Sequence, residues 1–263
     1  MNKSFNILSR IFKSIFLKQI PNYAIIYVDG RCNMKCGFCI HAAVDARATP
    51  SSITPEQWGQ IFKKANSLLH LTVTGGEPFL RKDFVQIIDN IILKCNVPRI
   101  SIKSNGFYVD RIKEYVPQLI EKHPNTEFTL SISLDGPEEI HDKVRVFKGA
   151  YKKVLETIAE MQQYRKKSNF FLRLASVITQ DNKHILDKLF EETASWPIDF
   201  HELILLRDVS PKEQLALKYD YERLSKIQHS RTSKTWQKSF NGRLFEKIFL
   251  ETIKRIDSDK IYS

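Results

Sequence analysis

The middle of the chain alternates between short apolar, β-branched runs and longer stretches with a helical spacing of apolar residues. This alternation is typical of βα units, in which helices cover a parallel sheet. The pattern therefore predicts an α/β fold with a parallel sheet, and its six strand-like runs fall short of the eight that close a TIM barrel. The expected strands span 23–29, 71–74, 99–104, 127–134, 170–179 and 198–206, and the expected helices 54–69, 83–95, 109–121, 150–166 and 183–195.

Three of the four cysteines, Cys32, Cys36 and Cys39, lie close together directly after the first expected strand. Three thiolates on one short loop suit an iron–sulfur cluster, because a closed zinc site or a cubane held only by protein takes four ligands. One iron is then open to a small molecule. Two other interpretations remain at this point: a turn that binds no metal, and a zinc ion completed by His41. The fourth cysteine, Cys95, ends a helical stretch and is expected to be a buried apolar residue.

Other strand ends also carry residues that suit contact with a ligand. The second expected strand runs into Gly75-Gly76-Glu77-Pro78, the third ends at Asn105-Gly106, and the fourth ends at Asp135. Two adjacent glycines let a backbone approach a ligand closely, although an ordinary strand-to-helix turn has the same composition. The carboxyl ends of parallel strands meet at one edge, so these segments and the cysteine loop are predicted to surround one site.

The cysteine spacing, with the aromatic Phe38 before the third cysteine, resembles the signature of the radical S-adenosylmethionine (radical SAM) superfamily. Residues 75–78, 132–137 and 141–145 resemble further motifs of that family, in the same order, and the matches run from about residue 23 to 207. The resemblance implies a partial, TIM-like (β/α)6 barrel that binds a 4Fe–4S cluster and SAM. It also implies an enzyme that cleaves SAM reductively to a 5′-deoxyadenosyl radical, which abstracts hydrogen from an unassigned substrate, either a peptide or a biosynthetic intermediate.

The resemblance further implies roles for individual residues. The implied cluster ligands are Cys32, Cys36 and Cys39, and the implied SAM contacts are Phe38, Gly75, Gly76, Glu77, Pro78, Asn105, Ser133, Asp135 and Arg145. In this scheme Glu77 accepts from the methionine ammonium, and Arg145 pairs with the methionine carboxylate. A surface arginine and a plain Asn-Gly turn are the alternatives for Arg145 and Asn105. The family usually has glycine after the arginine, where this chain has Val146. No catalytic side chain is assigned, because the cofactor carries the chemistry.

Strand periodicity predicts which side chains face the inside of the barrel. In the fourth strand the odd-numbered residues 129–135 are polar and the even-numbered residues 128–134 are apolar. The apolar face should meet the helices, which sends the polar face into the barrel and predicts a ligand cavity there. Lys103 falls on the same inner face, where it is expected to contact an anionic group of the substrate or Asp135. Arg173 and His201 are further candidates for this face. Leu205 either packs on adenine or belongs to the core.

Basic charge is concentrated at the two ends of the chain. Of the net charge of +11, residues 1–22 contribute +4 and residues 211–263 contribute +5, which leaves +2 for the middle. Residues 1–22 are expected to form a basic amphipathic helix that lies on an anionic membrane or packs on the barrel. Residues 23–209 then form the barrel, and residues 210–263 a helical extension.

Several expectations concern partners and location. No apolar run of 18 residues occurs, and basic residues interrupt every candidate signal peptide, so a cytoplasmic protein, with possible peripheral contact to a membrane, is expected. Basic ends suit an acidic flavodoxin or ferredoxin as electron donor, and no dedicated nucleic-acid motif is present. No cysteine follows Cys95, so no SPASM-type auxiliary cluster is expected in this polypeptide. The alternative function is a non-catalytic iron–sulfur accessory or sensor protein.

Overall fold

The structure is a computed structural model that describes residues 22–39, 51–65, 68–206 and 210–230. Within them, six parallel strands form one sheet in sequence order, β1-β2-β3-β4-β5-β6. The α/β architecture expected from the alternation is confirmed. The strands are β1 (Tyr23–Tyr27), β2 (His70–Thr74), β3 (Arg99–Ser104), β4 (Glu127–Ser133), β5 (Phe170–Ile178) and β6 (Phe200–Leu205).

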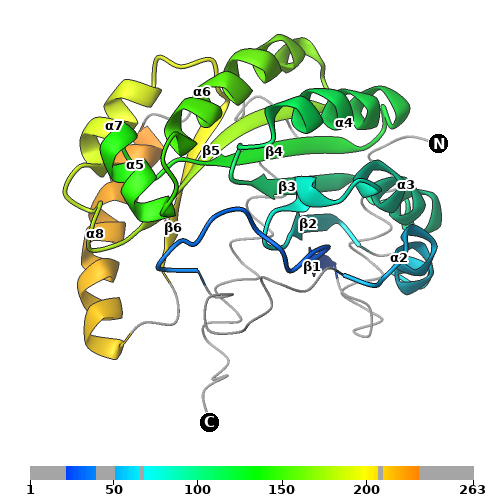
Figure 1. The fold of residues 1–263 in the computed structure, drawn as a ribbon, viewed down its shortest axis with the longest axis horizontal. Helices are drawn as coiled ribbons and strands as arrows, with labels where there is room; N and C mark the ends of the chain where they lie inside the picture. The colour runs from blue at the N-terminus through cyan, green and yellow to red at the C-terminus, as the bar shows by residue number, and fades with distance from the viewer. Residues whose placement is uncertain (1–21, 40–50, 66–67, 207–209, 231–263) are drawn as a thin grey trace.

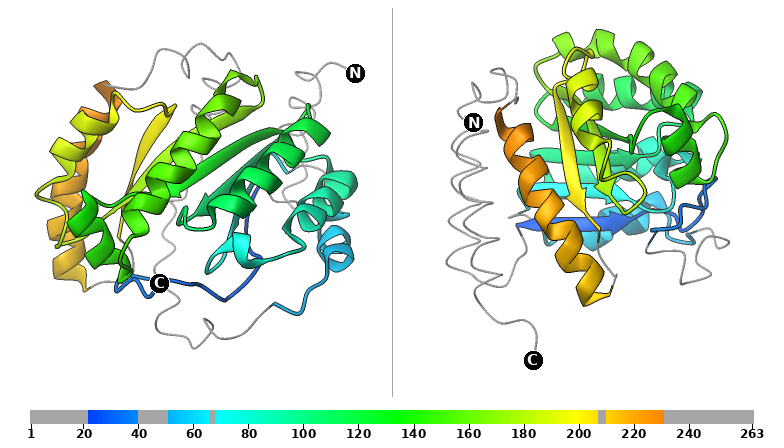
Figure 2. Two further views of the ribbon diagram at one scale, coloured as in Figure 1. Left: turned by 45° about the horizontal axis from the view of Figure 1, so that its top comes forward. Right: turned by 90° about the vertical axis from the view of Figure 1, so that its left-hand side faces the viewer.

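Helices follow the outer side of the curved sheet, as Figures 1 and 2 show. This is the arrangement of a partial barrel, because each crossover between sequential parallel strands carries its helix on the same side. The α-helices are α2 (Pro55–Phe62), α3 (Phe84–Cys95), α4 (Val109–Lys122), α5 (Glu138–Arg145), α6 (Ala150–Met161), α7 (Leu186–Thr193) and α8 (Pro211–Ser230), and the 3-10 helices are η3 (Pro78–Leu80) and η4 (Gln162–Lys166).

Local sequence explains most of the helix boundaries. Helix α2 begins at a capping box, in which the Thr54 hydroxyl accepts from the Gln57 backbone and the Gln57 side chain accepts from the Thr54 backbone. It ends at Phe62, earlier than the expected residue 69. Helix α3 ends where Asn96 adopts the left-handed conformation. Helix α5, at residues 138–145, was not expected from the periodicity, because eight residues give too short a pattern.

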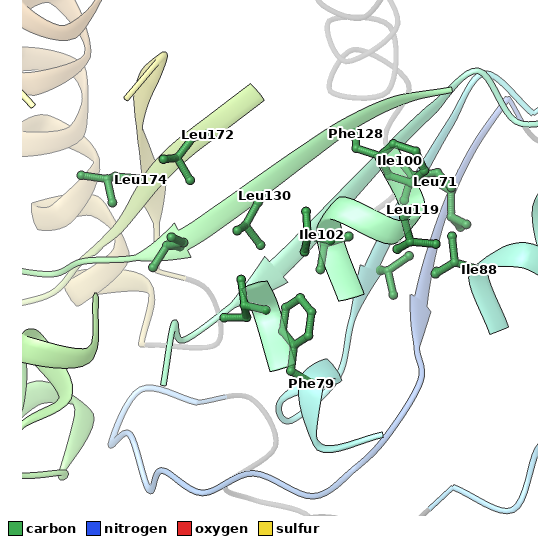
Figure 3. Close-up of a cluster of buried hydrophobic side chains, with 14 of the residues drawn as sticks. Leu71, Phe79, Ile88, Ile100, Ile102, Leu119, Phe128, Leu130, Leu172 and Leu174 are labelled. Atoms are coloured by element: carbon green, nitrogen blue, oxygen red, sulfur yellow. The ribbon is translucent and has the colours of Figure 1, made fainter. Parts of the chain in front are cut away.

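The hydrophobic core lies between the sheet and its helices (Figure 3). The apolar face of β4 contributes Phe128, Leu130 and Ile132, all fully buried. Ile100 and Ile102 of β3 pair with Phe128 and Leu130 in the sheet register, so the neighbouring strands present the same face. The predicted assignment of faces is therefore confirmed for β3 and β4, and Cys95 is buried in this core as expected.

The predicted N-terminal helix lies outside the described residues, and so does the part of the C-terminal extension beyond residue 230. Helix α8 packs against β6 and α7. Its Arg223 lies 2.6 Å from Asp187 of α7 in an exposed ion pair. Among the helices that the structure describes, none combines the length and the apolar character needed to cross a membrane.

Candidate active site

A cavity of about 360 Å³ lies at the carboxyl ends of the strands. Its walls bring together all three cysteines of the loop and six of the nine residues expected to contact SAM: Phe38, Gly75, Gly76, Asn105, Ser133 and Arg145. The other three, Glu77, Pro78 and Asp135, do not line it. Contact of any of these residues with SAM stays a prediction.

Hydrogen bonds fasten the cysteine loop to the glycine turn beside it. The buried Asp29 accepts from the Arg31 backbone at 2.9 Å and pairs with its guanidinium at 2.7 Å. Backbone bonds then join the two segments, from Gly76 N to Asp29 O and from Glu77 N to Arg31 O, both at 2.8 Å. The position of the cysteines is therefore set by the turn after β2 as well as by their own loop.

Gly75 and Gly76 are required by this close approach. A Cβ on Gly75 would lie 2.4 Å from the Asp29 carbonyl oxygen, and one on Gly76 would lie 2.1 Å from the Arg31 carbonyl oxygen. Both neighbours are backbone atoms that a side-chain rotation cannot move. The two glycines therefore allow the backbone packing that positions the cysteine loop.

Each of two cysteine sulfurs has N–H donors nearby. Cys32 Sγ accepts from Met34 N at 3.4 Å and from Asn105 Nδ2 at 3.8 Å. Cys36 Sγ accepts from Arg145 Nη1 at 3.9 Å. Burial raises the pKa of Cys32 to about 11 and raises that of Cys36 as well, so metal binding at neutral pH must release protons.

The donor set fits an iron–sulfur cluster. All three thiols are free of disulfides, and all three line the cavity. In the described part of the chain, no three His, Cys, Asp or Glu side chains converge as the ligands of one metal ion would. An iron–sulfur cluster takes each thiolate on a separate iron, so three thiols around one cavity are chemically suited to it. His41, the zinc ligand of the alternative interpretation, lies outside the described residues.

Glu77 does not line the cavity but binds two residues that do, Ser104 and Asn105. Its fully buried carboxylate accepts from Asn105 N at 2.8 Å, from Ser104 Oγ at 2.9 Å and from Phe79 N at 3.1 Å. Burial raises the pKa of Glu77 to about 7, and these donors oppose that shift. The protein's own donors thus occupy the group expected to accept from the methionine ammonium. Pro78 begins η3 and is buried outside the cavity.

Asp135 and Arg145 form a buried pair beside the cysteines. Arg145 Nε donates to Asp135 Oδ2 at 2.6 Å, and Val177 N donates to Asp135 Oδ1 at 2.9 Å. Asp135 N donates to His141 Nδ1 at 3.1 Å, which joins the end of β4 to α5. Arg145 is therefore buried at the cavity wall, not on the surface, and Ser133, two residues before Asp135, lines the same cavity.

Lys103 lies on the predicted inner face, opposite Ser131 in the sheet register. Its partner differs from the expectation: Lys103 Nζ lies 2.7 Å from Glu202 Oε2 and 3.3 Å from Ser131 Oγ, and Asp135 is not involved. Glu202 belongs to β6, so the ion pair crosses the concave side of the sheet past β4 and β5. Burial favours a raised pKa for Glu202, but Lys103 and Arg173 outweigh it and lower that pKa.

The expected place of His201 was wrong. The register pairs His201 with Leu174, which lies on the helix side, and its ring bonds to Thr193 of α7. Arg173, by contrast, pairs with Ser131 and shares the inner face with Lys103, as expected. Residues that the motif search missed also line the cavity, namely Tyr27, Met34, Thr74, Ser104, Val177, Ile204 and Leu206. The period of 2 would have found Val177 and Ile204, and Leu205 also lines the cavity.

A family model described as "Radical SAM superfamily" matches residues 26–190, more than half of the chain. The sporulation killing factor maturation protein SkfB of Bacillus subtilis (strain 168) is 25% identical over 178 residues, which cover 67% of this chain and 40% of SkfB. The GTP 3′,8-cyclase of Synechocystis sp. is 23% identical over 222 residues, 82% of this chain and 64% of the cyclase. The chain thus matches less than two thirds of the length of either relative.

Solved structures share the fold. The structure titled "Native anSMEcpe with bound AdoMet" superposes with a TM-score of 0.59 at 20% identity, over 80% of this chain and 63% of that one. Streptococcus suis SuiB bound to S-adenosylmethionine superposes with a TM-score of 0.60 at 16% identity, over 86% of this chain and 52% of SuiB. Both titles name bound SAM, and the expectation of a partial TIM-like barrel is confirmed at the level of the fold.

Proposed function

Because the chain belongs to the radical SAM superfamily, we propose that it binds a 4Fe–4S cluster and SAM in this cavity and uses them to abstract hydrogen from an organic substrate. The observation that supports this most is that three cysteines and the glycine turn line one cavity. Cys32, Cys36 and Cys39 are the residues that would hold the cluster. When bound, the two cofactors supply a one-electron cleavage of a carbon–sulfur bond and a radical that takes hydrogen from substrate.

The chain's own residues are proposed to bind SAM and to hold the cysteine loop in position. Gly75 and Gly76 line the cavity, where their backbone can come close to SAM without a side chain in between. Asn105 holds the cysteine loop directly, because its Nδ2 donates to Asn33 Oδ1 at 2.8 Å. Ser133 and Arg145 complete the wall from β4 and α5 and offer donors to the ribose or carboxylate of SAM. The apolar Leu205 and Leu206 line the β6 side, which suits an adenine ring.

The substrate is proposed to enter the concave side of the sheet, next to Lys103. Lys103 is the charged group of this face that lines the cavity, and its side chain is 31% exposed. An ammonium in that position favours a substrate with an anionic group. Two of the similar proteins are named for maturation, the maturation protein SkfB and an anaerobic sulfatase-maturating enzyme, and SuiB has been solved bound to the precursor peptide SuiA. These support a peptide substrate, while the cyclase supports a small biosynthetic intermediate.

An electron donor is also needed. We propose an acidic protein of the flavodoxin or ferredoxin type, because the net charge of this chain is +11. Association with an anionic membrane surface through residues 1–22 stays a second, separate proposal.

Anaerobic reconstitution tests the function. The full chain, supplied with iron and sulfide, should hold about four irons and form 5′-deoxyadenosine from SAM and dithionite. Replacement of Cys32, Cys36 and Cys39 by Ala should abolish both. Cys95→Ala is the matched control. This cysteine is 3% exposed in the core, so its replacement should leave the iron content unchanged. Full activity in the triple variant would refute the proposal, and a cluster without cleavage of SAM would favour an accessory or sensor protein.

A further inference from the structure

The carboxyl end of α5 is packed directly on the cysteine loop. Phe147, just after the helix, lies 4.8 Å from the ring of Phe107, and both pack against a small buried cluster of Met34, Cys36 and Ala150. The chain reaches this position through Val146, whose φ of 52° is left-handed, a region that β-branched residues rarely adopt. This contact sets the last turn of α5, which carries Arg145, against Cys36.

Arg145 makes three kinds of contact there. Its Nη1 lies 3.9 Å from Cys36 Sγ, and its guanidinium carbon lies 5.2 Å from the centre of the Phe38 ring. Its remaining nitrogens pair with Asp135 Oδ2 at 2.6 Å. The guanidinium is therefore fixed in place on three sides, with one N–H directed at a cysteine sulfur.

Asp135 is itself held rigidly. Its second oxygen accepts from Val177 N at 2.9 Å, and its backbone carbonyl accepts from Asn182 Nδ2 at 2.9 Å. The carboxylate is fully buried and the Arg145 side chain is 9% exposed. Salt and water screen such a pair weakly, so its charges act on nearby groups more strongly than exposed charges would.

Cys32 and Cys36 differ in the charge of the groups that donate to their sulfurs. Cys32 accepts from neutral donors, a backbone N–H and the Asn105 amide. Cys36 accepts from a cation. Hydrogen bonds and charges near cysteine sulfurs are known determinants of the reduction potential of iron–sulfur clusters.

We infer that Arg145 and Asp135 set the reduction potential of the cluster through Cys36, with Arg145 raising it and Asp135 lowering it. An added electron near Cys36 Sγ is stabilised by the guanidinium and destabilised by the carboxylate. Arg145 donates directly to the sulfur, whereas Asp135 acts on it through charge alone, so the effect of Arg145 is the larger of the two. Both are positioning residues in this role. The inference rests on the proposed ligation by Cys36, and it is distinct from the expected contact between Arg145 and the SAM carboxylate.

The test is a redox titration of the reconstituted full chain without SAM. The paramagnetic signal of the reduced cluster gives the midpoint potential, and iron content is measured on each sample. Arg145→Met should shift the midpoint to a more negative potential, and Arg145→Lys should restore part of the shift. Asp135→Asn keeps an acceptor for Val177 N and should shift the midpoint in the opposite direction. Lys143→Met and Asp181→Asn remove the members of an exposed 3.0 Å pair, with Lys143 on the same helix, and should leave the midpoint unchanged.

Iron content separates the two proposals. If the wild-type chain holds no cluster, the proposed function fails. If the variants hold full iron and neither Arg145→Met nor Asp135→Asn moves the midpoint, the tuning role is wrong. Shifts of the same sign in both would also overturn it, because they would indicate a structural disturbance. If Arg145→Met loses the cluster, Arg145→Lys and Asp135→Asn decide: shifts of the predicted signs support the role, and unchanged midpoints refute it.

Discussion

His201 should make the folding stability of this chain depend on pH in a way that one substitution removes. The imidazole is buried between β6 and α7, where Nε2 lies 2.8 Å from Ser176 Oγ and Nδ1 lies 2.8 Å from Thr193 Oγ1. The Ser176 hydroxyl donates to the Leu134 carbonyl, so its oxygen is left to accept from Nε2–H. The hydrogen bonds therefore place a proton on Nε2, and in the neutral ring Nδ1 accepts from the Thr193 hydroxyl.

Burial lowers the pKa of His201 from its ordinary 6.5 to about 3 in the folded chain. The unfolded chain consequently binds more protons between these two values, and the free energy of unfolding falls as the pH falls. Each pKa unit is worth about 1.36 kcal/mol, so acidification from pH 7 to pH 5 costs roughly 2 kcal/mol through this residue alone. At pH 5 the folded ring is still neutral, and the result is the same for any folded pKa of 4 or below.

The measurement is urea unfolding of the full, metal-free chain at pH 7 and pH 5, for the wild type and His201→Phe. The phenyl ring keeps the edge contact with Phe190 and cannot titrate. At pH 7 the variant should be less stable by about 1–3 kcal/mol, because two hydrogen bonds are lost. At pH 5 that gap should narrow by about 2 kcal/mol. The other buried histidines occur in both proteins and cancel.

Thr193→Val serves as the control for this experiment. It removes one hydrogen bond to the ring and leaves the imidazole in place. Its destabilisation should therefore be similar at the two pH values. If wild type and His201→Phe lose stability in parallel between pH 7 and pH 5, the ring is not held neutral by burial and the reasoning is wrong.

Three further predictions follow from the site. Val146→Gly should raise the unfolding free energy by about 0.5–1 kcal/mol in urea unfolding, because it relieves a left-handed backbone at a side chain that is 56% exposed. Gly76→Ala should lower stability by about 1–3 kcal/mol and reduce iron content on reconstitution, because its methyl group would lie 2.1 Å from the Arg31 carbonyl oxygen; normal iron loading would contradict this. Lys103→Met should cost at most about 1 kcal/mol of stability, because the pair with Glu202 is about a third exposed. Once a substrate is known, its turnover should fall about tenfold to a hundredfold in Lys103→Met while uncoupled cleavage of SAM persists.

The sequence predicted the sheet and its two faces because both depend on local periodicity. Phe128, Leu130 and Ile132 alternate with polar residues, and no tertiary information is needed to separate the two sets. The partner of Lys103 could not be predicted in this way. Glu202 lies 99 positions away on a strand that does not neighbour β3, and only the curvature of the sheet brings the two side chains together.

Motif resemblance located the site but did not specify what each side chain does there. The valine in place of glycine after Arg145 suggested a departure from the family pattern. In the structure Val146 adopts the left-handed conformation that glycine favours, at a cost in backbone strain. The predicted face of His201 was wrong for a different reason. The register of β6 depends on pairing with β5 and cannot be read from the strand alone.

The two buried carboxylates of the motifs show a common structural principle. Glu77 follows β2 and accepts from Asn105 N, just after β3. Asp135 follows β4 and accepts from Val177 N within β5. In each case a carboxylate beyond the end of one strand binds a backbone N–H of the next strand or of the turn after it. A parallel sheet leaves such groups without ladder partners where its strands diverge, and a buried N–H needs an acceptor. These residues therefore hold the rim of the cavity at a fixed width, while their neighbours Gly76, Asn105 and Ser133 face the space inside it.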